Sequence, residues 1–147
     1  MRQSLSDLRP AARAATAAVA LSVVLAVVAV VDQLGAQALA DHATAMYAPS
    51  GKEVSSGLLY GLVYTVAVIE LLLWFVVVRA VRARRRFASG LAVLVVAITG
   101  ALAVTLLVAS EYGARIFPPV WGVLAILPPV AGILAVVLLT RVRRQSD

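Results

Sequence analysis

Apolar residues gather into four long blocks along the chain. The blocks cover residues at about 12–31, 57–79, 87–109 and 118–140. About 20 apolar residues, at a helical rise of 1.5 Å each, are enough to cross the hydrocarbon core of a bilayer. The pattern therefore predicts an all-α membrane protein, with one domain over residues 1–147 that forms a bundle of four transmembrane helices.

Basic residues mark one side of the predicted bundle. Of the thirteen lysines and arginines, eleven lie in the first thirteen residues, in the segment 79–86 and in the C-terminal tail, whereas the other two connections hold only Lys52 and Arg115. Cytoplasmic loops of membrane proteins carry an excess of such residues. We therefore expect both termini and the arginine loop 79–86 to be cytoplasmic, and residues 32–56 to form an outer segment.

The first apolar block allows more than one interpretation. It follows a basic N-terminus, and Ala38 and Ala40 resemble the small residues of a signal-peptide cleavage site. Signal peptides have an apolar core of about 7–15 residues, whereas this run has about 18 and ends well before Ala38. We therefore favour an uncleaved helix. Because Gln33, Gln37 and Asp41 recur at every fourth position, this helix can alternatively continue outside the bilayer to about residue 45.

Small and aromatic residues suggest how the helices pack. In lipid the hydrophobic effect does not drive helix against helix, so close packing through small residues must do so. Small residues four positions apart lie on one face of a helix, and the candidate pairs are Gly57 with Gly61, Ala97 with Ala101, and Ala131 with Ala135. Aromatic residues toward the helix ends are typical of anchors at the membrane interface, and the sequence offers Tyr60, Tyr64, Trp74 and Trp121.

Polar residues inside the apolar blocks fall near one depth. Glu70 lies nine residues before the arginine loop, which places it about 13–14 Å from that end of its helix. Ser22 lies at the same depth, Thr99 slightly deeper, and Pro128 and Pro129 at a similar level. Each proline removes an N–H group and frees the carbonyl four residues earlier. The sequence therefore predicts an intramembrane polar site made of these five residues.

Glu70 has a functional and a structural interpretation. A charged carboxylate in mid-membrane costs roughly a few to more than ten kcal/mol, so we expect a protonated carboxyl that donates a hydrogen bond. It either responds to protons or cations in a small polar cavity, or acts as a neutral hydrogen-bonding clamp while Ser22 and Thr99 bond their own helices. Because no second ionisable residue lies at this depth, we favour the structural interpretation.

Other chemistry-bearing residues are sparse. The chain has no cysteine and one histidine, His42, which excludes thiolate ligands and a bis-histidine haem site within one chain. A lone histidine with the scattered acids Asp32, Asp41 and Glu53 is not a metal-binding set. No catalytic triad, phosphate-binding glycine loop or carboxylate pair can be assembled. We therefore expect no enzymatic activity, no metal and no cofactor.

The arginines also bear on partners and source. Arg82, Arg84, Arg85 and Arg86 are candidates for binding anionic lipid headgroups as well as for setting the topology. The net charge of +6 is no sign of nucleic-acid binding, because the basic residues adjoin the apolar blocks. Arginine outnumbers lysine twelve to one, and alanine and valine dominate the blocks, as in GC-rich bacteria. We therefore expect a multi-pass protein of the bacterial cytoplasmic membrane.

Two functions fit this sequence. The first is a non-enzymatic binding or accessory subunit of a larger membrane assembly, in contact with another membrane protein or a second copy. The alternative is a small oligomeric transporter or channel for protons or cations with Glu70 as its intramembrane site. That outline resembles the small multidrug-resistance transporters, from which the chain departs because its acid lies in the second helix rather than the first. With no continuous polar pathway in the sequence, we favour the first function.

Overall fold

Four long helices form the body of the protein. The computed structural model describes residues 5–53 and 55–144, and its long helices are α1 (Leu5–Leu34), α3 (Ser56–Arg82), α4 (Ala88–Val108) and α5 (Pro119–Arg144). Each of the four is long and apolar enough to cross a membrane. The prediction of four long apolar helices is therefore confirmed.

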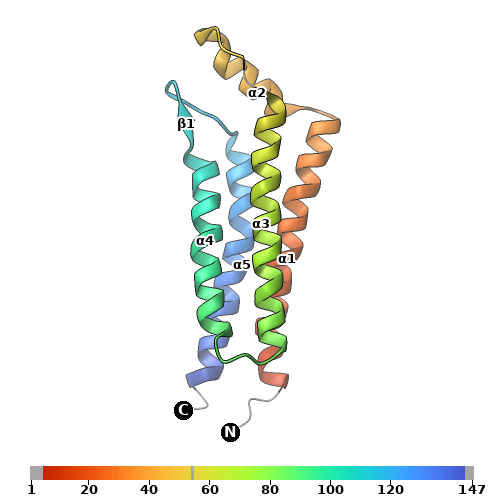
Figure 1. The fold of residues 1–147 in the computed structure, drawn as a ribbon, viewed down its shortest axis with the longest axis vertical. Helices are drawn as coiled ribbons and strands as arrows, with labels where there is room; N and C mark the ends of the chain where they lie inside the picture. Colours follow the sequence, from red (N-terminus) through yellow and green to blue (C-terminus); the bar gives the residue numbers. More distant parts are fainter. Residues whose placement is uncertain (1–4, 54, 145–147) are drawn as a thin grey trace.

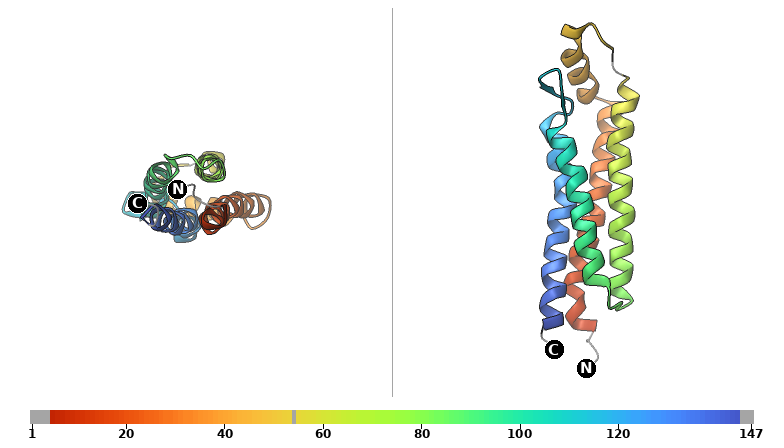
Figure 2. Two further views of the ribbon diagram at one scale, coloured as in Figure 1. Left: turned by 90° about the horizontal axis from the view of Figure 1, so that it is seen from below. Right: turned by 60° about the vertical axis from the view of Figure 1, so that its left-hand side comes forward.

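Successive long helices run in opposite directions. The start of α1 and the end of α5 lie at one end of the bundle, hereafter the terminal end, and α2 (Ala38–Tyr47) lies at the other, the α2 end (Figure 1). Seen along its axis, the bundle is a ring in which α1 and α4 each lie between α3 and α5 (Figure 2). The pair α3 and α4 packs less closely than the other three neighbouring pairs.

The first helix ends earlier than its longest predicted form. α1 stops at Leu34 and α2 begins at Ala38, so the helix does not continue unbroken to about residue 45. Gln37 between them takes a left-handed backbone conformation, with φ of 54°. The Asp32 carboxylate accepts hydrogen bonds from the N–H groups of Ala38 at 3.0 Å and Leu39 at 3.1 Å. These bonds satisfy amides at the start of α2 that have no partner within the helix.

The α2 end carries a small folded cap. It consists of α2, the 3₁₀ turn Ala48–Ser50 and the antiparallel pair of strands β1 (Ser110–Glu111) and β2 (Ala114–Arg115). Three side-chain contacts join residues 42–52 to the hairpin that β1 and β2 form: Tyr47 with Glu111, His42 with the Arg115 carbonyl, and Lys52 with Tyr112. The cap therefore connects the outer segment predicted over residues 32–56 to the connection between α4 and α5.

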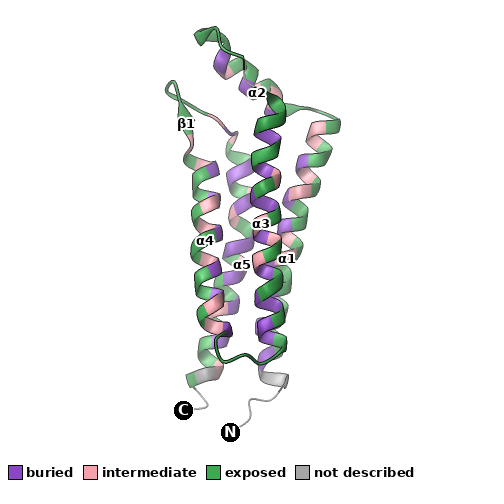
Figure 3. Ribbon diagram, in the orientation of Figure 1, coloured by how far each residue is buried: buried purple, intermediate pink, exposed green. Residues whose placement is uncertain are grey.

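The interior of the bundle divides into two apolar clusters. The cluster nearer the terminal end contains Leu8, Ala15, Trp74, Val95 and Ala135 among its buried residues. The cluster nearer the α2 end contains Leu25, Leu39, Val63, Ala103 and Trp121. Figure 3 shows the buried positions recurring along each long helix, with exposed positions between them. This is the burial expected of helices that face both a core and lipid.

Two of the three predicted pairs of small residues do not lie at helix contacts. Gly57, Gly61, Ala97 and Ala101 are exposed, and Ala135 is the one fully buried member of the predicted pairs. These exposed residues face away from the neighbouring helices, so two of the three pairs make no helix contact within the chain. Glycines of α5 make the close approaches instead, as described next.

Two glycines of α5 lie against bulky residues of other helices. A β-carbon on Gly122 would lie 2.7 Å from atoms of Leu107 on α4, and one on Gly132 would overlap the indole ring of Trp74 on α3. Trp74 is fully buried, and Tyr60 and Trp121 nearly so, which corrects their assignment as anchors at the membrane interface. Glycine is needed at position 132 because the tryptophan ring takes the space of a side chain.

Candidate functional site

The candidate site is a set of buried residues inside the bundle, one or two from each long helix. Ser22 on α1, Glu70 on α3 and Thr99 on α4 are fully buried, and they are the only polar or charged side chains classed as buried in the described part of the chain. Pro128 and Pro129 on α5 are buried as well. All five residues of the predicted intramembrane site therefore lie in the interior.

These residues lie between the two apolar clusters. On every long helix the site position falls between a residue of one cluster and a residue of the other: Ser22 between Ala18 and Leu25, Glu70 between Ala67 and Trp74, Thr99 between Val95 and Ala103, and Pro128 between Ala125 and Ala135. Because neighbouring helices share both clusters, the positions between them fall at one level of the bundle. We call this level the polar layer.

The two hydroxyl groups of the polar layer bond to their own helices. Ser22 Oγ donates to the Ala18 carbonyl at 3.0 Å, and Thr99 Oγ1 donates to the Val95 carbonyl at 2.8 Å. Serine and threonine inside helices commonly use this bond to the carbonyl four residues earlier. Neither hydroxyl therefore donates its proton to Glu70.

The Glu70 carboxyl has no hydrogen-bond partner among the described residues. Both of its oxygens are buried, and so is the Trp74 indole N–H, which also lacks a partner. Buried polar groups in proteins are nearly always hydrogen-bonded, so each exception requires a physical explanation. The two residues are four positions apart on α3 and so lie on the same face of the helix. That spacing was visible in the sequence. It could not show that both side chains are buried or that their polar atoms have no hydrogen-bond partner.

The prolines of α5 place backbone acceptors near the same level. Pro128 and Pro129 lie inside the helix without ending it, since α5 continues to Arg144. Because proline has no N–H, the carbonyls of Leu124 and Ala125 lose their helical donors. A protonated carboxyl in the polar layer can donate one hydrogen bond, and such carbonyls are acceptors of the right kind.

Aromatic residues lie on both sides of the polar layer. The Trp74 ring packs against Gly132 toward the terminal end. Toward the α2 end, the rings of Tyr60 and Trp121 meet edge to face, with their centroids 6.5 Å apart. Buried side chains above and below the layer are apolar or aromatic throughout the described residues. The carboxyl is therefore enclosed by groups that solvate charge poorly.

The predicted headgroup-binding arginines lie at the terminal end. Arg82, Arg84, Arg85 and Arg86 are exposed, at the end of α3 and in the loop that follows. Arg84, Arg85 and Arg86 line one pocket together with Ser89. Arg82 lines a second pocket with Arg85 and a third that it shares with α1. No one of these pockets is lined by all four arginines.

Neither metal clusters nor relatives point to a further function. In residues 5–53 and 55–144, no three His, Cys, Asp or Glu residues come together in a way that could hold a metal ion. The sequence matches no protein-family model, no curated protein and no solved structure. What the protein does is therefore argued from its own geometry.

Proposed function

We propose that this protein is a non-enzymatic membrane protein that binds another membrane protein as an accessory subunit. The supporting observation is a groove of about 600 Å³ on the side of the bundle, between α3 and α4. Aliphatic residues from both helices line it, including Leu58, Leu62, Ile69, Leu102 and Leu106. It lies between the two neighbouring helices that pack least closely, where a further helix has most to contact.

The groove suits a transmembrane helix of a partner. Along α3 its lining extends from Leu58 to Ile69, about 16 Å, or roughly half the thickness of a bilayer core. At the α2 end, the polar residues Tyr47, Glu53 and Glu111 line its mouth. A helix with an apolar face and hydrogen-bond donors or a basic residue near its end complements both parts. The adjoining cap extends the same surface beyond the bilayer.

The interior supports binding rather than transport. A pathway for ions or protons needs polar groups at successive depths, usually with a second ionisable residue. Among the described residues, buried polar and charged side chains occur only in the polar layer. Ser22 and Thr99 are bonded to their own helices there. The proposed function therefore depends on the outer surface of the bundle.

Photo-crosslinking from two neighbouring positions tests this proposal. Leu62 lies in the groove, whereas Val68 on the same helix is similarly exposed and does not line it. With a photoreactive residue at each position in turn, we expect position 62 to crosslink to one defined membrane protein in cells and position 68 not to do so. Crosslinks to lipid alone, or equal protein crosslinks at both positions, would contradict the proposal.

Glu70 supports a second candidate, a proton- or cation-linked transporter or channel. The observation that favours it is the buried carboxyl without a partner. Carbodiimide labelling in lipid, from about pH 5 to about pH 9, distinguishes the two functions, with Glu70→Gln as the control. Labelling of Glu70 that falls as the pH rises identifies a reachable, titrating carboxyl and favours transport. No labelling of the folded protein leaves the accessory role as the better explanation.

A further inference from the structure

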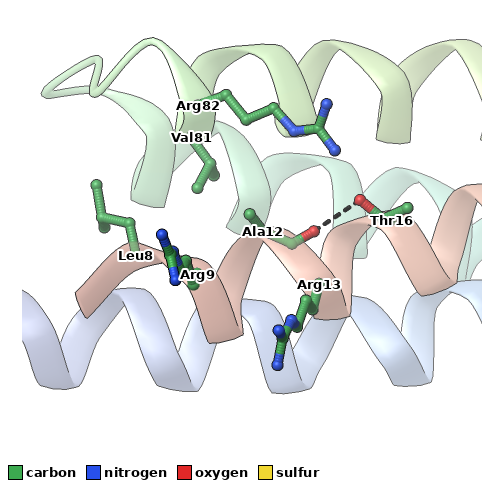
Figure 4. A pocket seen from close by; sticks show the side chains of 7 residues that line it. All are labelled: Leu8, Arg9, Ala12, Arg13, Thr16, Val81 and Arg82. Atoms are coloured by element: carbon green, nitrogen blue, oxygen red, sulfur yellow. Dashed lines mark hydrogen bonds between the residues drawn. The ribbon is translucent and has the colours of Figure 1, made fainter. Parts of the chain in front are cut away.

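We propose that a pocket between α1 and α3, at the terminal end, binds the headgroup of an anionic phospholipid that carries two phosphates. The pocket has a volume of about 450 Å³ (Figure 4). Its charged lining residues are Arg9 and Arg13 from α1 and Arg82 from α3. Of these, only Arg82 belongs to the arginines that the sequence suggested for lipid binding, so the pocket combines one residue of the arginine loop with two residues of α1.

The arrangement of the arginines carries this inference. Arg9 and Arg13 are one helical turn apart and so project from the same side of α1, about 6 Å from each other along its axis. Arg82 lines the same pocket from the neighbouring helix (Figure 4). A guanidinium group binds phosphate through two parallel hydrogen bonds and keeps its charge at any physiological pH. Three such groups on one pocket complement a ligand with two negative charges.

The described lining residues of the pocket do not neutralise these charges. None of the described residues that line it is acidic. Thr16 Oγ1 donates its proton to the Ala12 carbonyl at 2.8 Å, so the threonine oxygen keeps lone pairs free to accept a hydrogen bond. A glycerol hydroxyl beside a phosphate is a suitable donor. The polar groups therefore match a headgroup in which glycerol links phosphates.

Apolar residues beside the arginines favour a lipid over a soluble phosphate. The rest of the described lining is apolar and consists of Leu8, Ala12 and Val81. Leu8 and Val81 are members of the apolar cluster of the terminal end, and Ala12 packs against it. The pocket opens where the apolar stretch of α1 begins and that of α3 ends, so acyl chains can continue along the exposed apolar sides of these helices. Basic pockets between membrane helices bind phospholipids with several negative charges for these reasons.

Lipid binding to the purified full-length protein tests the proposal. We would titrate the protein in detergent with a two-phosphate phospholipid, a one-phosphate phosphatidylglycerol and a zwitterionic phosphatidylcholine, and count bound lipids by native mass spectrometry. We expect one tightly bound two-phosphate lipid, weaker binding of phosphatidylglycerol and none of phosphatidylcholine. Soluble inorganic phosphate should not compete. Equal binding of the two anionic lipids, or displacement by inorganic phosphate, would overturn the proposal.

Two pairs of substitutions locate the site. The variant Arg13→Lys with Arg82→Lys keeps the positive charge that sets topology but removes the forked geometry, and should weaken binding of the two-phosphate lipid at least about tenfold. The matched control, Arg85→Lys with Arg86→Lys in the loop, should bind as the unmodified protein does. An equal loss in both variants would mean general attraction to the basic end. No loss in the first variant would place the lipid elsewhere.

Discussion

Two acids within the long helices have opposite surroundings. Asp32, near the end of α1, accepts hydrogen bonds from two backbone N–H groups of α2 and from the Tyr60 hydroxyl at 2.6 Å. Glu70, in the middle of α3, has no partner for either oxygen in the described structure. The difference indicates that Asp32 holds the fold together, whereas Glu70 contributes no hydrogen bond to the fold.

Their positions along the helices explain the difference. Asp32 lies where one helix ends and the next begins, so the free amides at the start of α2 can bond to it. Around Glu70 the helices are unbroken, except at the prolines, and their amides are already used within the helices. The neighbouring hydroxyl groups bond to their own backbone as well. A mid-helix acid in lipid therefore needs a partner from outside the regular backbone.

The largest expected effect on stability tests whether Trp74 packs tightly against α5 beside the polar layer. In Gly132→Ala the added methyl group would overlap the Trp74 ring, so the ring or α5 must shift. We expect a loss of about 3 kcal/mol in unfolding free energy, measured by denaturation in mixed micelles. Gly100→Ala on α4 is the control, because nothing lies within 4 Å of its added carbon. Equal stability of the two variants would mean that Trp74 does not close this side.

A smaller loss is expected when Asp32 is removed. Asp32→Ala leaves the Tyr60 hydroxyl and two amides of α2 without their acceptor. We expect a cost of about 2 kcal/mol in the same measurement. Asp41→Ala is the matched control, since Asp41 is exposed on α2. If both variants were equally stable, the hydrogen bonds of Asp32 would not stabilise the fold, and the contrast with Glu70 would be wrong.

The opposite sign is expected for Glu70. Glu70→Leu removes a buried polar group that has no partner, so the variant should be about 1 kcal/mol more stable than the unmodified chain. Ser22→Ala serves as a control within the polar layer and should change little, because its hydroxyl bonds only to its own helix. A loss comparable to that of Asp32→Ala would show that Glu70 clamps the bundle, as the structural interpretation of the sequence held.

The depth of the polar layer could be predicted from the sequence, whereas the rotation of the helices could not. Counting residues from the basic ends placed Ser22, Glu70 and Thr99 near one level, because helical rise is constant. Which face of a helix turns inward depends on a contrast between its faces, and a helix that is apolar all round lacks that contrast. For this reason Ala97 and Ala101 were assigned to a contact, and Trp74 to the membrane interface.

The α2 end was harder to predict because its contacts join distant parts of the chain. Asp32 bonds to Tyr60, and Tyr47 bonds to Glu111, across separations that no periodic pattern reveals. The break at Gln37 depends on the Asp32 carboxylate, which the sequence presented only as one of several scattered acids. Long-range pairs of this kind come from the tertiary fold. From the sequence, only the polar character of residues 32–56 could be predicted.

The smallest expected effect is a pH dependence of stability that arises from one bond in the cap. Tyr47 donates a hydrogen bond to Glu111 Oε2 at 2.5 Å, and this bond raises the pKa of Tyr47 to about 12. Since an unfolded tyrosine ionises at about pH 10, the stabilisation by this bond is complete below that pH and is lost as the pH rises toward about 12. We expect the stability of Tyr47→Phe to fall less than that of the unmodified protein over this range.

Ultraviolet difference titration of the two proteins measures the Tyr47 phenol directly, because the other three tyrosines are common to both. If the Tyr47 phenol ionises at about pH 10, the bond to Glu111 does not form in solution. The cap would then be less tightly joined than the structure indicates. The contrast between acids at the α2 end and Glu70 would then depend on Asp32 alone.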